Sequence, residues 1–399
     1  MISFEFNEEE DFKIPSNQLS QESALTIYND FKNKISIDFP NPINQNCYVI
    51  RSNGYIGQVP INDEFLLIIK PKVPIQNIFS RLEYAYNLKS IQFLDGITGY
   101  DSVEDVFEYL ASIFAKMVIK RNKKGLYQSY IEKSEHLPYI KGRLNVKSTA
   151  SALINKSIKI ECEYDELTAD LIENKIIAWT LYRLLSYDIK RQDVRLEIRH
   201  AYRAISGRVE TTQIEIKDCV NQLYNKLNED YKPMHALCRF FLEHSGPLQN
   251  RGEHEYVPFI LNMPILFESF VAEWLKINIP DGWDIEKQYN IELDENREYS
   301  FKIDLVIFEK SSHRVLAVLD TKYKRTTRPL INDIHEIVSY AVRMNTESAI
   351  LIYPSLNTKA NSIPVGDKVK VYCITFDLNK DLKEAGDLFL KSIKDELYT

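Results

Sequence analysis

The 399-residue sequence predicts an α/β fold of the α+β type, in which a mixed C-terminal sheet is flanked by helices. Two apolar runs of strand length, 301–307 and 315–319, are separated by a polar turn and predict a hairpin. A run with apolar positions at helical spacing precedes this hairpin, and a second helix starts near Asp333. Strand-like runs at 349–353 and 368–376 complete the order helix, strand, hairpin, helix, strand, strand.

The rest of the chain predicts a β-rich N-terminal domain followed by helices. From about 35 to 75, short runs rich in Ile, Val and Phe are broken by turn residues. Residues 1 to about 20 are polar and acidic and are expected to form a loose or short leading segment. Helices are expected at 76–88, 101–120, 165–188, 217–228 and 231–244. We therefore expect an N-terminal β-rich or mixed domain (1–155), a helical region (156–250) and a C-terminal domain (251–399).

The predicted hairpin carries two carboxylates and a lysine. Residues two apart on a strand share a face, so Asp320 and Lys322 point the same way and Thr321 points away. A hairpin symmetric about Ser312 places Asp304 opposite Asp320, within a shift of one or two residues. Charges on apolar strands are costly unless they are paired or bound to a metal, and Mg²⁺ accepts one or two carboxylates. The cluster therefore predicts a metal site, although a solvated strand face with a salt bridge remains the alternative for the D-x-K triplet alone.

Acidic residues on the two flanking helices are candidates for the same site. On the helix that starts near Pro264, Glu268 lies beside the predicted buried stripe, whereas Glu273 lies further round and is expected to be solvated. Glu268 is therefore the better candidate to face the site. On the later helix, Asp333 and Glu336 have the spacing of a capping box, which would give Glu336 a structural role.

This arrangement resembles the PD-(D/E)xK nuclease superfamily, and the wider sequence resembles the McrC family, the nuclease subunits of McrBC-type restriction systems. The resemblance covers roughly residues 35–378 and depends on the shared order of several short segments. These segments are Ile69-Lys70-Pro71-Lys72-Val73, Gly125-Leu126 with Tyr130, Leu137-Pro138-Tyr139-Ile140-Lys141-Gly142-Arg143, Asp170-Leu171-Ile172-Glu173-Asn174-Lys175, Leu266-Phe267-Glu268-Ser269-Phe270-Val271 and Leu319-Asp320-Thr321-Lys322-Tyr323-Lys324.

The resemblance implies roles for the residues of the hairpin and the first helix. Asp304 and Asp320 would bind Mg²⁺, with Mn²⁺ as a substitute and the Thr321 carbonyl as a further ligand. Lys322 would be the catalytic lysine that orients the attacking water, and Glu268 an auxiliary acid.

Residue 336 departs from the family pattern. The family usually has Gln four residues before the tyrosine that corresponds to Tyr340, and this chain has Glu336 there. Two roles are open for Glu336: it caps the helix, or it adds charge near the metal.

The net charge of −7 bears on how the protein meets DNA. Much of DNA affinity comes from neutralising phosphates with Lys and Arg, so an acidic nuclease is expected to need recruitment by a partner or a local basic track. One basic track, 116–124, is expected to be a solvated helix end. The other follows the catalytic lysine, and it makes Lys324, Arg325 and Arg328, together with Tyr340, candidate DNA contacts.

Nucleotide hydrolysis is not expected of this chain, because it contains no G-x-x-x-x-G-K-[ST] loop. The resemblance implies that an McrB-like AAA+ GTPase or ATPase hexamer supplies this activity and binds the N-terminal domain. The leading hypothesis is therefore a Mg²⁺-dependent endodeoxyribonuclease subunit of a modification-dependent or related restriction system, driven by a partner whose hydrolysis it stimulates. A non-catalytic adaptor of an AAA+ partner and a stand-alone DNA repair nuclease are the alternatives. No run approaches a membrane span and no secretion signal is visible, so a cytoplasmic protein without membrane contact is expected.

Overall fold

The computed structural model groups the chain into two compact units. One contains Met1–Phe107 and His244–Thr399, and the other contains Glu108–Glu243. The division into three domains that the sequence predicts stays a prediction. The structure describes residues 2–8, 10–62, 64–86, 88, 102–147, 149, 159–187, 189–220, 222–244, 249–251, 254–256, 259–292, 300–326, 328–356, 362–366 and 368–397.

The N-terminal part of the first unit contains two small sheets and the helix α1. The first sheet has the order β1-β6-β5-β12, and the second has the order β2-β4-β3. The bounds are β1 Ile2–Asn7, β2 Phe12–Pro15, α1 Gln21–Asp30, β3 Ile35–Asp38, β4 Cys47–Ser52, β5 Tyr55–Pro60, β6 Phe65–Lys70, α2 Ile75–Ala85 and β12 Ile260–Asn262. The prediction of a β-rich N-terminal region is therefore confirmed.

The expectation of a loose leading segment is wrong, because β1 pairs in parallel with β6 along its whole length. Phe6 is buried, and the ring of Phe4 stacks on Phe65 at a centroid distance of 6.0 Å. Apolar side chains alternate with polar ones along β1, which is the pattern of a half-buried strand. The acidic residues after Asn7 concealed this short alternation.

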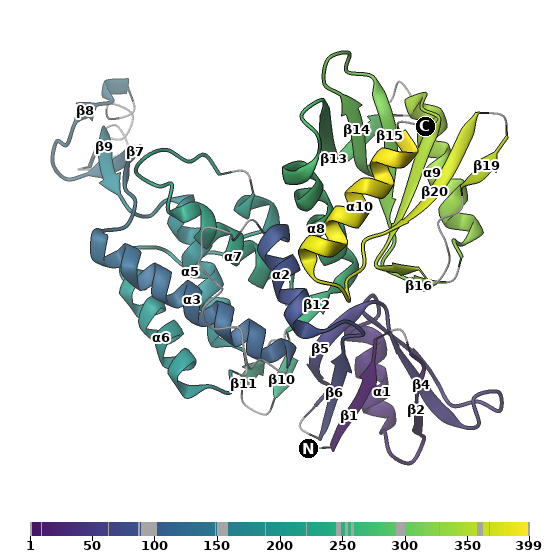
Figure 1. The fold of residues 1–399 in the computed structure, drawn as a ribbon. Coiled ribbons are helices and arrows are strands. Elements are labelled where there is room, and N and C mark those ends of the chain that lie inside the picture. Colours follow the sequence, from purple (N-terminus) through teal and green to yellow (C-terminus); the bar gives the residue numbers. More distant parts are fainter. Residues whose placement is uncertain are drawn as a thin grey trace. The chain divides into compact units, whose positions relative to one another are not determined.

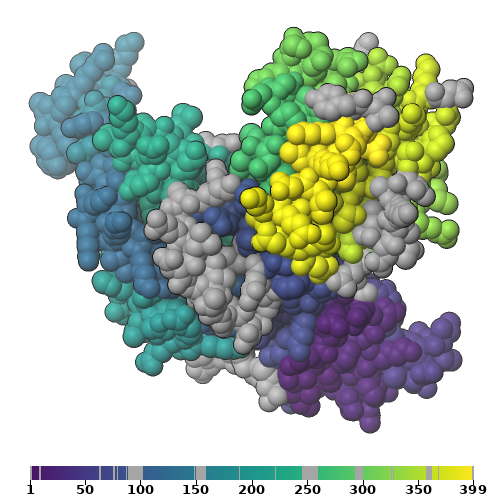
Figure 2. Space-filling view, viewed as in Figure 1, coloured from purple at the N-terminus to yellow at the C-terminus, as the bar shows by residue number. Residues whose placement is uncertain are grey.

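A six-stranded mixed sheet forms the C-terminal part of the first unit, with the order β13-β14-β15-β17-β20-β19. Figure 1 shows α8 and α10 on one face of this sheet and α9 on the other. The outer side of α10, in yellow, is part of the molecular surface (Figure 2). The bounds are α8 Met263–Asn278, β13 Trp283–Glu292, β14 Ser300–Glu309, β15 Val315–Thr321, β16 Arg325–Thr326, α9 Ile331–Met344, β17 Ser348–Tyr353, β18 Ser355–Leu356, β19 Ile363–Val365, β20 Val369–Thr375 and α10 Leu382–Leu397.

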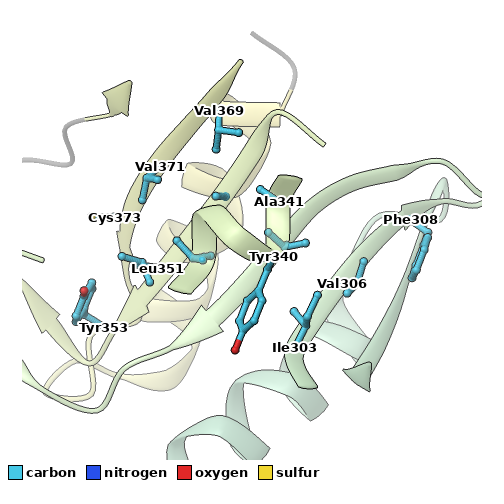
Figure 3. Close-up of a cluster of buried hydrophobic side chains, with 13 residues drawn as sticks. Ile303, Val306, Phe308, Tyr340, Ala341, Leu351, Tyr353, Val369, Val371 and Cys373 are labelled. Carbon is cyan, nitrogen blue, oxygen red and sulfur yellow. The ribbon is translucent and has the colours of Figure 1, made fainter. Parts of the chain in front are cut away.

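The strand directions explain why the middle of this sheet is buried on both faces. The strands β14 and β15 form the predicted antiparallel hairpin, while β15, β17 and β20 run parallel. Parallel strands covered by helices are apolar on both sides, as the runs in β17 and β20 are. Figure 3 shows the core between the sheet and α9, where Tyr340 and Ala341 face Ile303, Leu351 and other buried side chains. The predicted mixed sheet flanked by helices is confirmed.

Strand β12 connects the N-terminal sheet directly to the helix α8. Its residues pair with β5, and α8 begins at the next residue, where the side chain of Asn262 accepts a hydrogen bond from the backbone N–H of Ile265. The backbone N–H of Met263 donates to the carbonyl of Gly54. The start of α8 is thus held by the N-terminal sheet.

The second unit is a group of helices with a three-stranded sheet of the order β7-β9-β8. Its bounds are α3 Val103–Lys124 (which begins in the first unit), β7 Ser129–Leu137, β8 Arg143–Leu144, β9 Ile160–Thr168, α5 Ile172–Leu185, α6 Gln192–Ser206, η1 Ile216–Cys219 and α7 Tyr231–Glu243. The prediction of a helix at 217–228 is wrong beyond the single turn η1. The helix predicted from residue 165 starts at Ile172, because β9 occupies the residues up to Thr168. The basic track at 116–124 forms the end of α3, where Arg121 pairs with Asp230.

The remaining short strands, β10 (Gln249–Arg251) and β11 (His254–Tyr256), pair with each other. Across the described ranges, no helix has the length and apolar character needed to cross a membrane.

Candidate active site

The hairpin has the predicted register. Leu305 pairs with Leu319, and the next two pairs keep the same symmetry about Ser312. Continued by one residue, this register places Asp304 opposite Asp320. The only irregularity is a bulge near the turn, at Ile307/Phe308, on the side away from the carboxylates.

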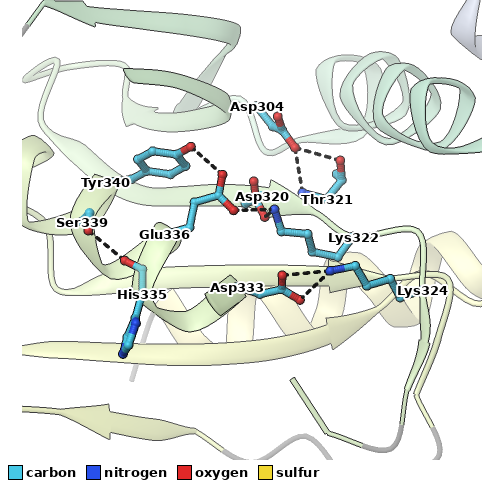
Figure 4. Close-up of polar contacts among 10 residues, drawn as sticks. All are labelled: Asp304, Asp320, Thr321, Lys322, Lys324, Asp333, His335, Glu336, Ser339 and Tyr340. Carbon is cyan, nitrogen blue, oxygen red and sulfur yellow. Dashed lines mark hydrogen bonds and ion pairs between the residues drawn. The ribbon is translucent and has the colours of Figure 1, made fainter. Parts of the chain in front are cut away.

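Side chains from β15, from the residue that follows it and from α9 meet beside the sheet (Figure 4). Nζ of Lys322 lies 2.7 Å from Oδ2 of Asp320 and 2.8 Å from Oε2 of Glu336. Asp320 is 3% exposed, whereas the side chain of Glu336 is 43% exposed. Glu336 also accepts a hydrogen bond from the hydroxyl of Tyr340 at 3.0 Å. The lysine therefore bridges one buried and one partly exposed carboxylate.

Asp304 is fixed by Thr321. Oδ2 of Asp304 accepts hydrogen bonds from both the backbone N–H and the hydroxyl of Thr321, each at 2.9 Å. The expectation that Thr321 points away from the cluster is therefore wrong. Strand alternation ends here because β15 stops at Thr321, so the side chain is free to turn toward Asp304.

The capping-box interpretation of Glu336 is also wrong. Helix α9 begins at Ile331 with Leu330 as its cap residue, and no side chain caps it. Asp333 lies inside the helix, is buried, and accepts hydrogen bonds from Nζ of Lys324. The helix starts at Ile331, before Asp333, so Asp333 is not its cap residue and the side chain of Glu336 lies in the cluster. Of the two roles left open for Glu336, the structure favours added charge.

Burial raises the pKa values of both aspartates, and the charge of Asp304 adds to the rise at Asp320. Burial, followed by the charge of Asp304, raises the pKa of Asp320 to about 7. Burial also raises the pKa of Asp304, although its hydrogen bonds from Thr321 act in the opposite direction. A bound divalent cation would stabilise the ionised form of both carboxylates.

Lys322 is held as a cation. Burial alone would lower its pKa, but its ion pairs with Asp320 and Glu336 outweigh burial and raise it. For Glu336, burial acts to raise the pKa, and the hydrogen bond from Lys322 outweighs it, so that the pKa is lowered. The pair Lys322–Glu336 is therefore ionised at neutral pH.

Glu268 approaches from α8, together with a residue that sequence reasoning missed. Burial and the charge of Asp304 raise the pKa of Glu268. The side-chain amide of Gln288 donates a hydrogen bond to Oε1 of Glu268. Gln288 has a φ of 53°, and the β13–β14 ladder skips it and Asp304. A non-glycine residue at positive φ often marks a functional site, but only the backbone shows it and the sequence carries no signal.

The expected DNA contacts are placed differently from one another. Lys324 is paired with Asp333, and Tyr340 is buried in the core with its hydroxyl bound to Glu336. Arg328 is exposed beyond the cluster, while the side chain of Arg325 lies outside the described residues. Glu273, expected to be solvated, is partly buried and pairs with Lys287.

The residues present fit a divalent cation of the Mg²⁺ type. In the part of the chain that the structure describes, no three His, Cys, Asp or Glu side chains form a metal cage. Mg²⁺ does not require one, because it binds through one or two carboxylates and keeps several waters. Asp304 and Asp320 supply two oxygen donors with raised pKa values, and nothing in this donor set favours a softer metal.

The fold and the cluster together define an α+β protein whose C-terminal sheet carries a buried carboxylate, a partly buried carboxylate and a lysine. Residues 50–354 match the family described as "McrBC 5-methylcytosine restriction system component". That match covers more than half of the chain, so the chain belongs to the McrBC family, as the resemblance in its sequence implies.

Two relatives extend this finding. The chain is 24% identical over 330 residues to the "Type IV methyl-directed restriction enzyme EcoKMcrBC" of Escherichia coli K12, covering 74% of this chain and 92% of that protein. A chain in the structure of Thermococcus gammatolerans McrB AAA+ hexamers with bound McrC matches with a TM-score of 0.56 and 18% identity. That match covers 99% of this chain and 100% of the other, so the two share a fold over their whole lengths.

Proposed function

We propose that this chain is the Mg²⁺-dependent endonuclease subunit of a McrBC-type restriction system. The observation that carries the proposal is the convergence of Asp304, Asp320 and Lys322 at one point of the sheet. Lys322 Nζ lies 2.7 Å from Asp320, and Asp304 is held in place by two hydrogen bonds from Thr321. An adaptor that only bound a partner would not need these buried charges.

Each residue has a distinct role in phosphodiester cleavage. Asp304 and Asp320 would hold the cation, which when bound supplies Lewis-acid stabilisation of phosphate charge. The two carboxylate partners of Lys322 keep it protonated. As a cation it would face the scissile phosphate and orient the attacking water by hydrogen bonding. Glu268, with its raised pKa, would accept or return a proton at the edge of the site.

The first test is cleavage of plasmid DNA by the Asp320→Ala variant together with its AAA+ partner. Loss of cleavage by about 10²–10³-fold, with the partner's nucleotide hydrolysis still stimulated, is expected. Asp284→Ala is the matched control, because Asp284 is an exposed aspartate on β13 of the same sheet. Normal cleavage by Asp320→Ala would refute the nuclease assignment and leave the adaptor function.

We further propose that an McrB-like AAA+ hexamer, a GTPase or ATPase, recruits this chain to DNA and is stimulated by it through the N-terminal 155 residues. The net charge of −7 supports recruitment, because the cluster's own lysines are already paired with acids. McrB AAA+ hexamers with bound McrC are the subject of the matched Thermococcus structure. The matched family is described by 5-methylcytosine restriction, which makes 5-methylcytosine in DNA the first modification to test.

A surface inside the N-terminal 155 residues has the character of a partner-binding site. Around the connection from β7 to β8, Tyr139, Ile140 and Val146 are 60%, 69% and 68% exposed, and Tyr130, at the other end of β7, is 69% exposed. Neighbouring exposed apolar side chains, such as those at the β7–β8 connection, are typical of protein–protein interaction sites.

Full-length variants test this surface best, since a fragment ending at residue 155 would cut through both compact units. Tyr139→Ser with Ile140→Ser is expected to abolish stimulation of the partner's hydrolysis and, with it, DNA cleavage. Leu223→Ser, at a residue that is 89% exposed elsewhere in the same unit, is the control. Unchanged stimulation by the double variant would remove this surface from the proposal.

A further inference from the structure

Three sequence segments that are far apart in the chain meet directly behind the proposed catalytic lysine. They are Ile69–Val73, from the end of β6 onward, Leu266–Val271 in α8, and Leu319–Lys324, which runs from the end of β15 into the following turn. The proposed chemistry uses residues of the second and third segments but none of the first. Their meeting point is the side chain of Tyr323, which immediately follows Lys322 and is 5% exposed.

The N-terminal sheet contributes a buried carboxylate to this point. Oε1 of Glu8 accepts a hydrogen bond from the hydroxyl of Tyr323 at 2.9 Å and another from the backbone N–H of Lys72 at 3.0 Å. Glu8 is 2% exposed, and its own backbone N–H donates to the carbonyl of Lys70. The carboxylate is therefore fixed by the ends of β1 and β6. Hydrogen bonds to a charged acceptor in a buried place are among the stronger ones in proteins.

The ring of Tyr323 is also held from two sides. Nζ of Lys72 lies 4.4 Å from its centroid, within the range of a cation–π interaction, and the ring of Phe267 lies 5.9 Å away. Phe267 precedes Glu268 on α8. The tyrosine thus contacts the N-terminal sheet and the helix that carries the auxiliary acid.

The backbone around Lys322 transmits this constraint to the site. The N–H of Lys322 donates to the carbonyl of Ile352 on β17, and the N–H of Lys324 turns back to the carbonyl of Lys322. Tyr323 is the middle residue of this tight turn. A shift of its side chain would therefore rotate the peptide that carries Lys322.

We propose that Glu8 and Lys72 of the N-terminal sheet hold Tyr323, and through it place Lys322, for cleavage. Tyr323 and Glu8 are positioning residues, since neither touches the proposed metal or phosphate site. The N-terminal sheet is then a structural part of the nuclease in addition to any role in binding a partner. This inference rests on the proposed nuclease function.

The test compares plasmid cleavage by the wild-type chain, Tyr323→Phe, Glu8→Met and the double variant, each with the AAA+ partner. Each single variant is expected to lower kcat by about 10- to 100-fold with KM for DNA unchanged, as small misplacements of catalytic groups do. The double variant should lose no more than the worse single variant, because both remove the same hydrogen bond. Glu8→Gln retains an acceptor oxygen and should restore most of the wild-type kcat.

Tyr55→Phe is the matched control, because the Tyr55 hydroxyl also has a side-chain partner, Asn262, in the same unit but away from Lys322. Stimulation of the partner's hydrolysis should be unchanged in all variants. A kcat for Tyr323→Phe within about twofold of the wild type, or a loss that Tyr55→Phe shows equally, would overturn the inference.

The same experiment separates this inference from the proposed function. If the wild type does not cut DNA, or if Asp320→Ala cuts it, the nuclease assignment fails. If the wild type cuts, Asp320→Ala does not, and Tyr323→Phe cuts normally, only the positioning role fails.

Discussion

The ammonium group of Lys322 lies 2.8 Å from a carboxylate oxygen of Glu336, on a helix that begins nine residues after the lysine. The same ammonium group lies 2.7 Å from Asp320, so Lys322 is paired with a carboxylate of the sheet and a carboxylate of α9. Glu336 is in turn bound by the hydroxyl of Tyr340. This chain of contacts ties the position of the proposed catalytic lysine to α9.

Replacement of Glu336 separates its geometry from its charge. Glu336→Gln keeps oxygen and nitrogen atoms in place for Lys322 and Tyr340, so cleavage is expected to stay within about fivefold of the wild type. Glu336→Leu removes both contacts and should lower kcat by about 10- to 100-fold. Initial rates on plasmid DNA in the presence of the partner measure both effects.

Glu347→Leu, on the loop before β17, is a suitable control for the added apolar side chain. Equal losses in Glu336→Gln and Glu336→Leu would mean that the negative charge, and not the hydrogen bonding, is what the site requires.

Mg²⁺ should stabilise the wild-type chain at pH 8 but not the Asp320→Asn variant. Folding raises the pKa of Asp320 from 3.8 to about 7, so its ionisation at pH 8 works against the folded state. A bound cation offsets this repulsion, and saturation at about ten times Kd should raise the melting temperature by roughly 2–4 °C. Thermal melts with and without 10-fold excess MgCl₂ over Kd test this without any cleavage assay.

In the absence of metal, Asp320→Asn should melt at a higher temperature than the wild type, because the variant removes one of two repelling carboxylates. Asp284→Asn should behave like the wild type in both conditions. An Mg²⁺ shift that survives in Asp320→Asn would show that the cation binds elsewhere.

The hairpin was predictable because its determinants are local. Two apolar runs, a polar turn and alternation set the register, and Leu305 pairs with Leu319 as the symmetry about Ser312 requires. By contrast, Glu336 lies in the cluster because of the residue at which α9 begins, and Gln288 because of its positive φ. Both features depend on tertiary packing. Residue patterns within one segment do not contain that information.

Two fold errors have different causes. Helix α6 is missing from the predicted elements, although Val194, Ile198, Ala201 and Ile205 have the spacing that predicts a helix. Strand β1 is stabilised by pairing with a strand about sixty residues later, which no local pattern reveals. The contact between Glu8 and Tyr323 is of this second kind, since the two are 315 positions apart.

Gly386→Ala should destabilise the C-terminal sheet and its helices. A Cβ at Gly386 of α10 would lie 2.3 Å from a ring carbon of Trp274 on α8, and this indole is packed among Phe376 and Phe389. Overpacking of this kind costs about 1–3 kcal/mol, in spite of the better helix propensity of alanine. Urea unfolding followed by tryptophan fluorescence measures the change. Gly282→Ala, where a Cβ meets nothing within 4 Å, should change stability by less than about 0.5 kcal/mol.

Acid should destabilise the second unit through His235. This side chain is fully buried, and burial lowers its pKa from 6.5 to about 4. Nε2 must donate to the carbonyl of Glu173, which only accepts, so the neutral Nδ1 accepts from the hydroxyl of Tyr224. Protonation would place a positive charge in a buried site without relief from solvent.

The sign follows from the lowered pKa. Between pH 6.5 and 4 the unfolded chain binds more protons at this residue than the folded chain, so stability falls as pH falls through that window. The loss from His235 is about 2 kcal/mol at pH 5. Hydrogen exchange of the α7 amides at pH 7.5 and 5.0, corrected for intrinsic rates, reports it locally. His235→Gln should be less stable than the wild type at pH 7.5 but show a flatter dependence of stability on pH. His200→Gln, at an exposed histidine, should follow the wild type. Parallel pH curves for His235→Gln and the wild type would contradict the assignment.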